Sequence, residues 1–159
     1  MNVVNYPGED LNVLATLAGL KCLQLTSRRL VSLAGIDSLQ GLITLDLAYC
    51  PKLGSLTGIE RCQKLQMVEL KNCKKVGDVS CLGELLNLRE LFINDCGTIR
   101  SLQPLAKCRH LENLIFYGDT NIEDGDLATI LEIPKLKKMW FADRSHYSHK
   151  RDQISAAIS

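Results

Sequence analysis

The sequence has no long hydrophobic run and almost no excess of charge. It contains no stretch of about 18 apolar residues, which is what a membrane-spanning helix needs. Its start, MNVVNYPGED, lacks the order of basic and then apolar residues that marks a secretion signal. We therefore expect a soluble, cytoplasmic chain. Lysine and arginine total 19 against 18 for aspartate and glutamate, so the overall charge predicts neither a nucleic-acid partner nor a membrane surface.

The sequence also lacks the short motifs of the common catalytic sites. It has no G-x-S-x-G, no H-E-x-x-H and no glycine loop of the kind that cradles phosphate. Cys22 is the one thiol expected on a strand surface, and no base is placed beside it. His146 and His149 are spaced like the start of a metal site but have no third ligand. We therefore expect no enzyme activity, no cofactor and no metal.

The seven cysteines indicate a reducing compartment rather than a disulfide framework. Their number is odd, and no C-x-x-C pair suggests a zinc site. A buried free thiol behaves as a small hydrophobic group. Five of the cysteines occupy apolar positions of a recurring pattern and are therefore expected in the core: Cys50, Cys62, Cys73, Cys96 and Cys108.

An internal repeat is the dominant feature that is present. In residues 42–62, 65–85 and 88–108, eight apolar residues recur at the same spacing, 3, 2, 3, 3, 3, 3 and 3 positions apart. The blocks begin 23 residues apart, a period that indicates a solenoid whose repeats bury their apolar side chains against one another. With 159 residues and a hydrophobic fraction of 46%, the chain suits one domain with a continuous core.

This pattern resembles the leucine-rich repeat, L-x-x-L-x-L-x-x-N/C-x-L, with Cys50, Cys73 and Cys96 in the N/C position. The resemblance runs roughly from Leu11 to Asp143. It implies an α/β fold, a right-handed solenoid shaped like a horseshoe, with a parallel sheet of about six strands on its concave face. The three-residue spacing in the second half of each repeat predicts mostly 3₁₀ turns on the convex side. The ending, I-E-D-G-D-L and then D-R-S-H-Y-S-H-K, resembles those of stand-alone bacterial leucine-rich repeat proteins.

We divide this single domain, residues 1–159, into three parts. Residues 1–19 are a weak amino-terminal half-repeat, with Leu11, Leu14 and Leu17 at the repeat's spacing and a rudimentary strand at Val3 and Val4. Residues 20–143 hold the repeats, and residues 144–159 form a carboxy-terminal cap or tail.

Two repeats depart from the common length. Repeat one has 22 residues, with Arg28 at the cysteine position, and repeat five has 25, with Asp119 there. A last strand is expected at residues 137–142. Before it, an aspartate should cap a short helix with three inward apolar residues: Asp124 or Asp126, followed by Leu127, Ile130 and Leu131.

The candidate binding site consists of outward residues on the strands. Successive strand residues point to opposite faces, so the residues between the inward leucines face solvent. The partner-binding residues that we select lie in three neighbouring columns on the concave face: Asp46, Tyr49, Glu69, Lys71, Phe92, Asn94, Asp95, Ile115, Tyr117 and Trp140.

The two halves of this face differ in chemistry. Asp46 and Glu69 lie on neighbouring early strands, about 4.8 Å apart, whereas the later strands carry apolar and aromatic residues, including the only tryptophan. An exposed apolar cluster beside charges is typical of a protein-binding hot spot. The alternatives are that residues 144–159 fold back over Trp140 and Tyr117, and that the carboxylates are simply solvated.

These observations predict a non-catalytic, monomeric protein–protein interaction module that binds its partner through the concave face. Two alternatives remain open: an immunity- or inhibitor-type protein that blocks a toxin or enzyme, and a targeting or scaffold segment of a larger polypeptide. Basic residues in the loops that leave the strands either orient a dipolar partner or only keep that edge soluble: Arg28, Arg29, Lys52, Lys74, Lys75 and Arg100.

Overall fold

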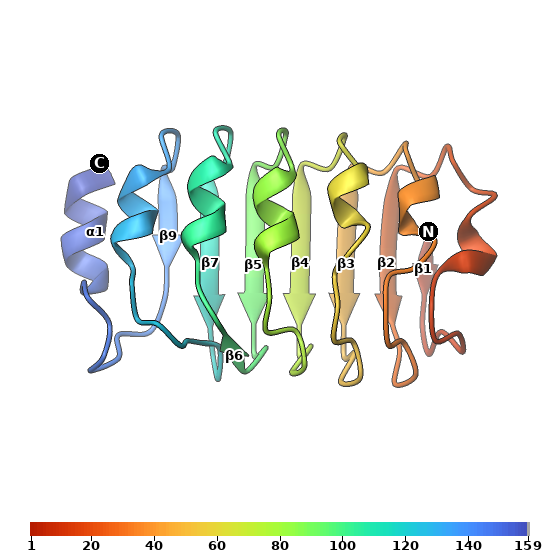
Figure 1. Ribbon diagram of the computed structural model, residues 1–159, viewed down its shortest axis with the longest axis horizontal. Coiled ribbons are helices and arrows are strands. Elements are labelled where there is room, and N and C mark those ends of the chain that lie inside the picture. Colours follow the sequence, from red (N-terminus) through yellow and green to blue (C-terminus); the bar gives the residue numbers. More distant parts are fainter. Residues whose placement is uncertain (159) are drawn as a thin grey trace.

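The computed structural model describes residues 1–158 and shows one long sheet with a layer of turns on one side (Figure 1). The seven strands of this sheet pair in parallel, each with the strand of the next repeat. In order they are β1 (Asn2–Val3), β2 (Cys22–Thr26), β3 (Thr44–Ala48), β4 (Met67–Lys71), β5 (Glu90–Asn94), β7 (Asn113–Tyr117) and β9 (Lys138–Trp140).

Short 3₁₀ turns form the second layer, in front of the strands in Figure 1. They lie at Asn12–Leu14, Ile36–Ser38, Ile59–Arg61, Ser80–Glu84, Gln103–Lys107 and Ala128–Glu132. Two short strands, β6 (Thr98–Ile99) and β8 (Asn121–Ile122), pair separately, and helix α1 (Arg151–Ile158) lies beyond β9. We call the side of the sheet away from the turns the open face; it corresponds to the expected concave face.

The core consists of the periodic apolar residues. Every one of the eight in residues 42–62, 65–85 and 88–108 is 2% exposed or less. A 3₁₀ turn has three residues per turn, so leucines three apart point in the same direction, toward the sheet. The prediction of stacked coils, with parallel strands on one side and 3₁₀ turns on the other, is confirmed.

The cysteines at the N/C position form a ladder across the repeats. Cys73 Sγ donates to Leu47 O at 3.4 Å, and Cys96 Sγ donates to Leu70 O at 3.4 Å. Each thiol therefore satisfies a strand carbonyl of the preceding repeat while its sulfur fills the core.

The ladder continues into the irregular repeats, but through residues that the spacing did not select. Ser27, not Arg28, is buried in repeat one, and its Oγ donates to Tyr6 O at 2.7 Å. Thr120, not Asp119, is buried in repeat five, and its Oγ1 donates to Ile93 O at 2.9 Å. The predictions for Arg28 and Asp119 are wrong. Repeat one loses its residue inside the turn that contains this position. Repeat five has one residue more before Thr120 and one fewer after it, since Ile122 still pairs with Ile99, 23 residues earlier, and its two extra residues follow Ile122.

Two leucines that were expected inside are outside. Leu131 is 42% exposed, because the segment forms a 3₁₀ turn and its inward residues are Leu127, Ile130 and Ile133, three apart. Leu17 is 40% exposed and lies beyond the first turn. The predicted aspartate cap is not found: Leu127 is the N-cap of this turn, and no side chain caps it. The two aspartates make local contacts before it, since Asp126 accepts a hydrogen bond from Ala128 N at 3.0 Å and Asp124 accepts one from Asp126 N at 3.1 Å.

The two ends of the stack are closed differently. At the amino end a rudimentary strand forms, but at Asn2–Val3 (β1) rather than at Val3 and Val4, and Val4 and Val13 remain 69% and 73% exposed. At the carboxy end Tyr147 and Ile154 are buried, and Ser148 N donates to Gly125 O at 2.8 Å. The tail therefore packs onto the last repeat as a cap.

Cys22 is expected to be the thiol that reacts first in the native protein. All seven cysteines are free, and burial raises the pKa of the Cys62, Cys81 and Cys108 thiols to about 11, so few thiolates form there at pH 7. Brief iodoacetamide treatment followed by peptide mass spectrometry should label mainly Cys22. The denatured chain serves as the control, in which every thiol reacts; rapid native labelling of Cys73 would contradict the core assignment.

Candidate functional site

The open face carries the predicted central column in register. Parallel pairing connects, in order across the sheet, Gln24, Asp46, Glu69, Phe92, Ile115 and Trp140. The neighbouring column connects Lys71, Asn94 and Tyr117. Residues that are far apart in the sequence therefore lie side by side on one surface.

An aromatic pair stands at the carboxy-terminal end of this surface. The Tyr117 and Trp140 ring centroids lie 5.8 Å apart, with the planes at 82°, the edge-to-face arrangement that aromatic rings favour. Tyr117 is 38% exposed and Trp140 44% exposed, and both line a shallow hollow with Ile115. We call Phe92, Ile115, Tyr117 and Trp140 the apolar cluster.

Residues 144–158 of the tail leave Tyr117 and Trp140 partly exposed. Helix α1 packs beside β9, and the Arg151 guanidinium carbon lies 5.6 Å from the centre of the Trp140 ring. This cation–π contact supports the indole from one side. The exposed fraction of Trp140 shows that the rest of the ring stays accessible.

An acidic pair stands at the other end of the same column. Asp46 and Glu69 are register partners, and Asp46 also accepts a hydrogen bond from Gln24 Nε2 at 3.4 Å. Burial raises the pKa of Glu69 most, and the negative charge of Asp46 raises it further. The positive charge of Lys71 lowers it in part. A cationic group placed here would reverse this shift, because it favours the charged carboxylate.

Asn94 is not the exposed residue that the column predicts. It is 4% exposed and lies between Lys71 and Tyr117, whose longer side chains flank it. Its Oδ1 accepts no hydrogen bond within residues 1–158. Asn94 therefore contributes packing between the two halves of the face rather than a contact surface.

Tyr49 and Asp95 lie at the edge of the open face, one residue beyond the ends of β3 and β5. Both have left-handed backbones, with φ of 54° and 55°. Asp95 turns toward the next repeat, where its Oδ1 accepts a hydrogen bond from Asp119 N at 3.3 Å. Tyr49 instead remains 56% exposed.

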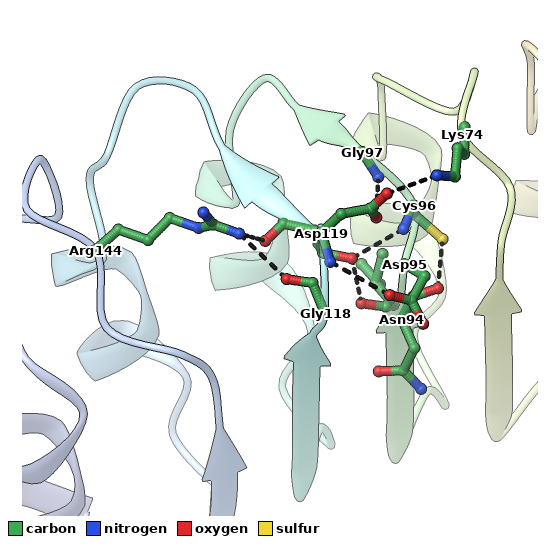
Figure 2. A network of polar contacts seen from close by, with 10 residues as sticks. Lys74, Asn94, Asp95, Cys96, Gly97, Gly118, Asp119 and Arg144 are labelled. Carbon is green, nitrogen blue, oxygen red and sulfur yellow. Dashed lines mark hydrogen bonds and ion pairs between the residues drawn. The ribbon is translucent and has the colours of Figure 1, made fainter.

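A polar network at this edge was missed by the sequence analysis (Figure 2). The Asp119 carboxylate pairs with Lys74 Nζ at 2.8 Å and accepts a hydrogen bond from Gly97 N at 3.1 Å. The contact with Lys74 lowers the pKa of Asp119 below its usual value, and the hydrogen bond from the Gly97 amide adds to this effect. Arg144 of the tail donates to Gly118 O at 3.2 Å and Thr120 O at 3.1 Å. The one feature of the sequence that pointed to this network was the altered length of repeat five.

The described residues offer little for metal chemistry. Within residues 1–158 no three histidine, cysteine or acidic side chains gather closely enough to hold a metal ion. His146 Nε2 lies 2.9 Å from Ile122 O, and His149 Nδ1 lies 2.9 Å from Ser148 Oγ, so both rings contact the cap itself. Over the same part of the chain, no helix has the length and apolar character needed to cross a membrane.

Three solved structures are similar to the chain. An internalin (inlF) from Listeria monocytogenes covers 86% of it at 20% identity, with a TM-score of 0.66. An internalin C2 (inlC2) from the same bacterium covers 88% at 24% identity, with a TM-score of 0.65. The LRR protein LIC12759 from Leptospira interrogans covers 97% at 16% identity, with a TM-score of 0.69.

The chain spans 40%, 62% and 45% of the lengths of these three proteins, respectively. No protein-family model matches the sequence, and no curated protein matches it. At such low identity the similarity concerns the fold. It agrees with the repeat pattern and the stacked coils: the chain has the leucine-rich repeat fold.

Proposed function

We propose that the chain is a non-catalytic protein-binding module that receives its partner on the open face. The leucine-rich repeat fold is in general a protein-interaction fold, which supports the class. One observation carries the choice of face: Tyr117 and Trp140 form an edge-to-face pair of exposed aromatic rings, and Trp140 lies in the same column as an acidic pair.

The two ends of the face have different tasks in this proposal. The apolar cluster supplies the buried centre of the interface, where aromatic side chains release water over a large area at small cost in conformational entropy. Asp46 and Glu69 select a partner that presents a basic side chain. Lys71, between the two ends, opposes a partner of uniformly positive charge.

Alanine at Trp140 or Tyr117 is expected to weaken partner binding by about 30-fold or more, the usual loss for an aromatic anchor. The partner is first captured from the native host with the immobilised chain, and affinities are then measured by calorimetry. The matched control is Leu131→Ala, because Leu131 is 42% exposed but lies in the layer of turns. Circular dichroism checks that each variant folds.

If the partner binds Trp140→Ala, Tyr117→Ala and Leu131→Ala with the same affinity, the open face is not the binding surface. Loss of binding in Leu131→Ala alone would move the interface to the layer of turns. An Asp46→Asn variant then tests the charge selection, since it removes one negative charge with little change in shape.

We further propose that the chain works as a monomer in the cytoplasm. Seven free cysteines support a reducing compartment, because such thiols are oxidised outside it. A second candidate, a scaffold segment whose amino end stacks on further repeats, is favoured by the exposed Val4 and Val13. The native open reading frame distinguishes the two, since the second requires repeats encoded upstream of Met1.

A further inference from the structure

A hollow separate from the apolar cluster lies where strands β1 to β4 end. Its volume is about 470 Å³, within the roughly 300–1,000 Å³ of small-ligand sites. Its walls include two cations, an amide and three apolar groups: Arg28, Lys74, Asn72, Tyr49, Pro51 and Val4. No carboxylate lines it.

Tyr49 has a backbone conformation that its residue type disfavours. The corresponding residues of four other coils also have positive φ: Asn5, Asn72, Asp95 and Gly118. These types tolerate the left-handed region, whereas a bulky side chain there is strained. The Tyr49 amide donates to Lys71 O at 2.8 Å, a contact that any of these residues would make.

The side chain of Tyr49 gives the fold little in return for this strain. It is 56% exposed, and Asn72 holds the same position in the next coil without an aromatic ring. A strained backbone conformation that brings no gain in packing is characteristic of a residue kept for binding. The ring instead forms one wall of the hollow.

The charges of the hollow indicate the sign of its ligand. Arg28 is exposed and forms no ion pair within residues 1–158, unlike Lys74, which pairs with Asp119 at 2.8 Å. A guanidinium has five donors in a planar fork that matches a carboxylate or a phosphate. The apolar wall of Tyr49 and Pro51 beside it matches a ligand with a flat, apolar part.

We propose that this hollow binds an aromatic anion, a ring that carries a phosphate or a carboxylate. Arg28 pairs with the anionic group, Asn72 offers its amide, and the ring packs on Tyr49 and Pro51. The chemistry is the same whether the group is a free small molecule or a phosphotyrosine of a protein. This site shares Tyr49 with the selected partner-binding residues but is separate from the apolar cluster, because neither Tyr117 nor Trp140 lines it.

Binding is tested by titrating the isotope-labelled chain with phenyl phosphate and phenylacetate at constant ionic strength, followed by amide NMR shifts. The expected result is saturable binding of at least one of them, with the shifts centred on residues 49 and 72, and about tenfold weaker binding of inorganic phosphate and of phenol. Equal binding of inorganic phosphate, or shifts that never saturate, would overturn the proposal. A capped phosphotyrosine peptide is titrated in the same way. If it binds more tightly than phenyl phosphate, the ligand is a protein; if it binds equally, the ligand is a small molecule.

Two variants test the residues. Arg28→Ala should lower the affinity about tenfold, while Arg109→Ala, an exposed arginine on the turn side, should not. Tyr49→Asn should raise Tm by about 2–4 °C by relieving strain, yet weaken binding about tenfold. An unchanged affinity in Tyr49→Asn, or equal affinities for the two arginine variants, would overturn the assignment. Trp140 does not line the hollow, so Trp140→Ala should leave the affinity for phenyl phosphate unchanged, and failure here is distinct from failure of the open face.

Discussion

Replacing Phe116 with alanine is expected to lower the free energy of unfolding by about 3–5 kcal/mol. Phe116 is 1% exposed, and its ring stacks on Phe141 with the centroids 5.1 Å apart and the planes at 5°. This stack joins the last two coils, so the truncation removes apolar contacts and leaves a cavity that rigid neighbouring strands fill poorly. Chemical denaturation followed by circular dichroism measures the loss.

Phe116→Leu is the matched control and should cost clearly less, because it retains most of the volume. Hydrogen exchange gives a second readout. Each coil contacts only its neighbours, so protection should fall in β7 and β9 more than in β2 and β3. Equal loss of protection along the whole sheet would show that the solenoid unfolds as one unit, and a cost below about 1 kcal/mol would show that the stack relaxes.

The regular coils were predictable because a single spacing determines them. Residues such as Leu45, Val68 and Leu91 recur at the 23-residue period, and that period alone places them in register inside the sheet. The same register orders the outward residues between them. For this reason the column from Asp46 to Ile115 follows from the period alone, whereas Trp140 lies 25 residues after Ile115 and was placed from the leucine-like pattern of the last strand.

The predictions failed where a repeat changes length. The spacing does not show that repeat one loses a residue before Ser27, or that repeat five shifts one residue to the front of Thr120, so Arg28 and Asp119 were chosen in place of Ser27 and Thr120. The polarity of the side chain was a usable signal, since a hydroxyl satisfies a buried carbonyl without a charge. The burial of Asn94 had no such signal, because it depends on the size of the side chains on both neighbouring strands.

The cap also lay beyond the repeat pattern, and yet it controls access to the candidate site. Helix α1 brings Arg151 over Trp140, and Arg144 attaches the same segment to repeat five. The position of the cap therefore determines how much of the indole faces solvent. Residues that fasten the cap should affect both stability and the environment of Trp140.

Tyr147 fastens the cap to the last two coils through its ring and its hydroxyl. It is 6% exposed, its ring lies edge-on to Phe141 with the centroids 5.9 Å apart, and its hydroxyl accepts a hydrogen bond from Ile122 N at 3.1 Å. Tyr147→Ala is expected to cost about 3–5 kcal/mol of unfolding free energy, as for other buried aromatic truncations. Tyr147→Phe keeps the ring and leaves the Ile122 amide without its acceptor, which should cost about 1–3 kcal/mol.

The fluorescence of Trp140, the only tryptophan, reports the same change locally. In Tyr147→Ala the cap loosens, Arg151 leaves the indole, and the emission should shift toward that of a solvated tryptophan before the sheet unfolds. In Tyr147→Phe the spectrum should stay native, because the ring still holds the cap in place. If Tyr147→Ala leaves the emission unchanged, the cap does not set the exposure of Trp140, and the indole is held by β9 alone.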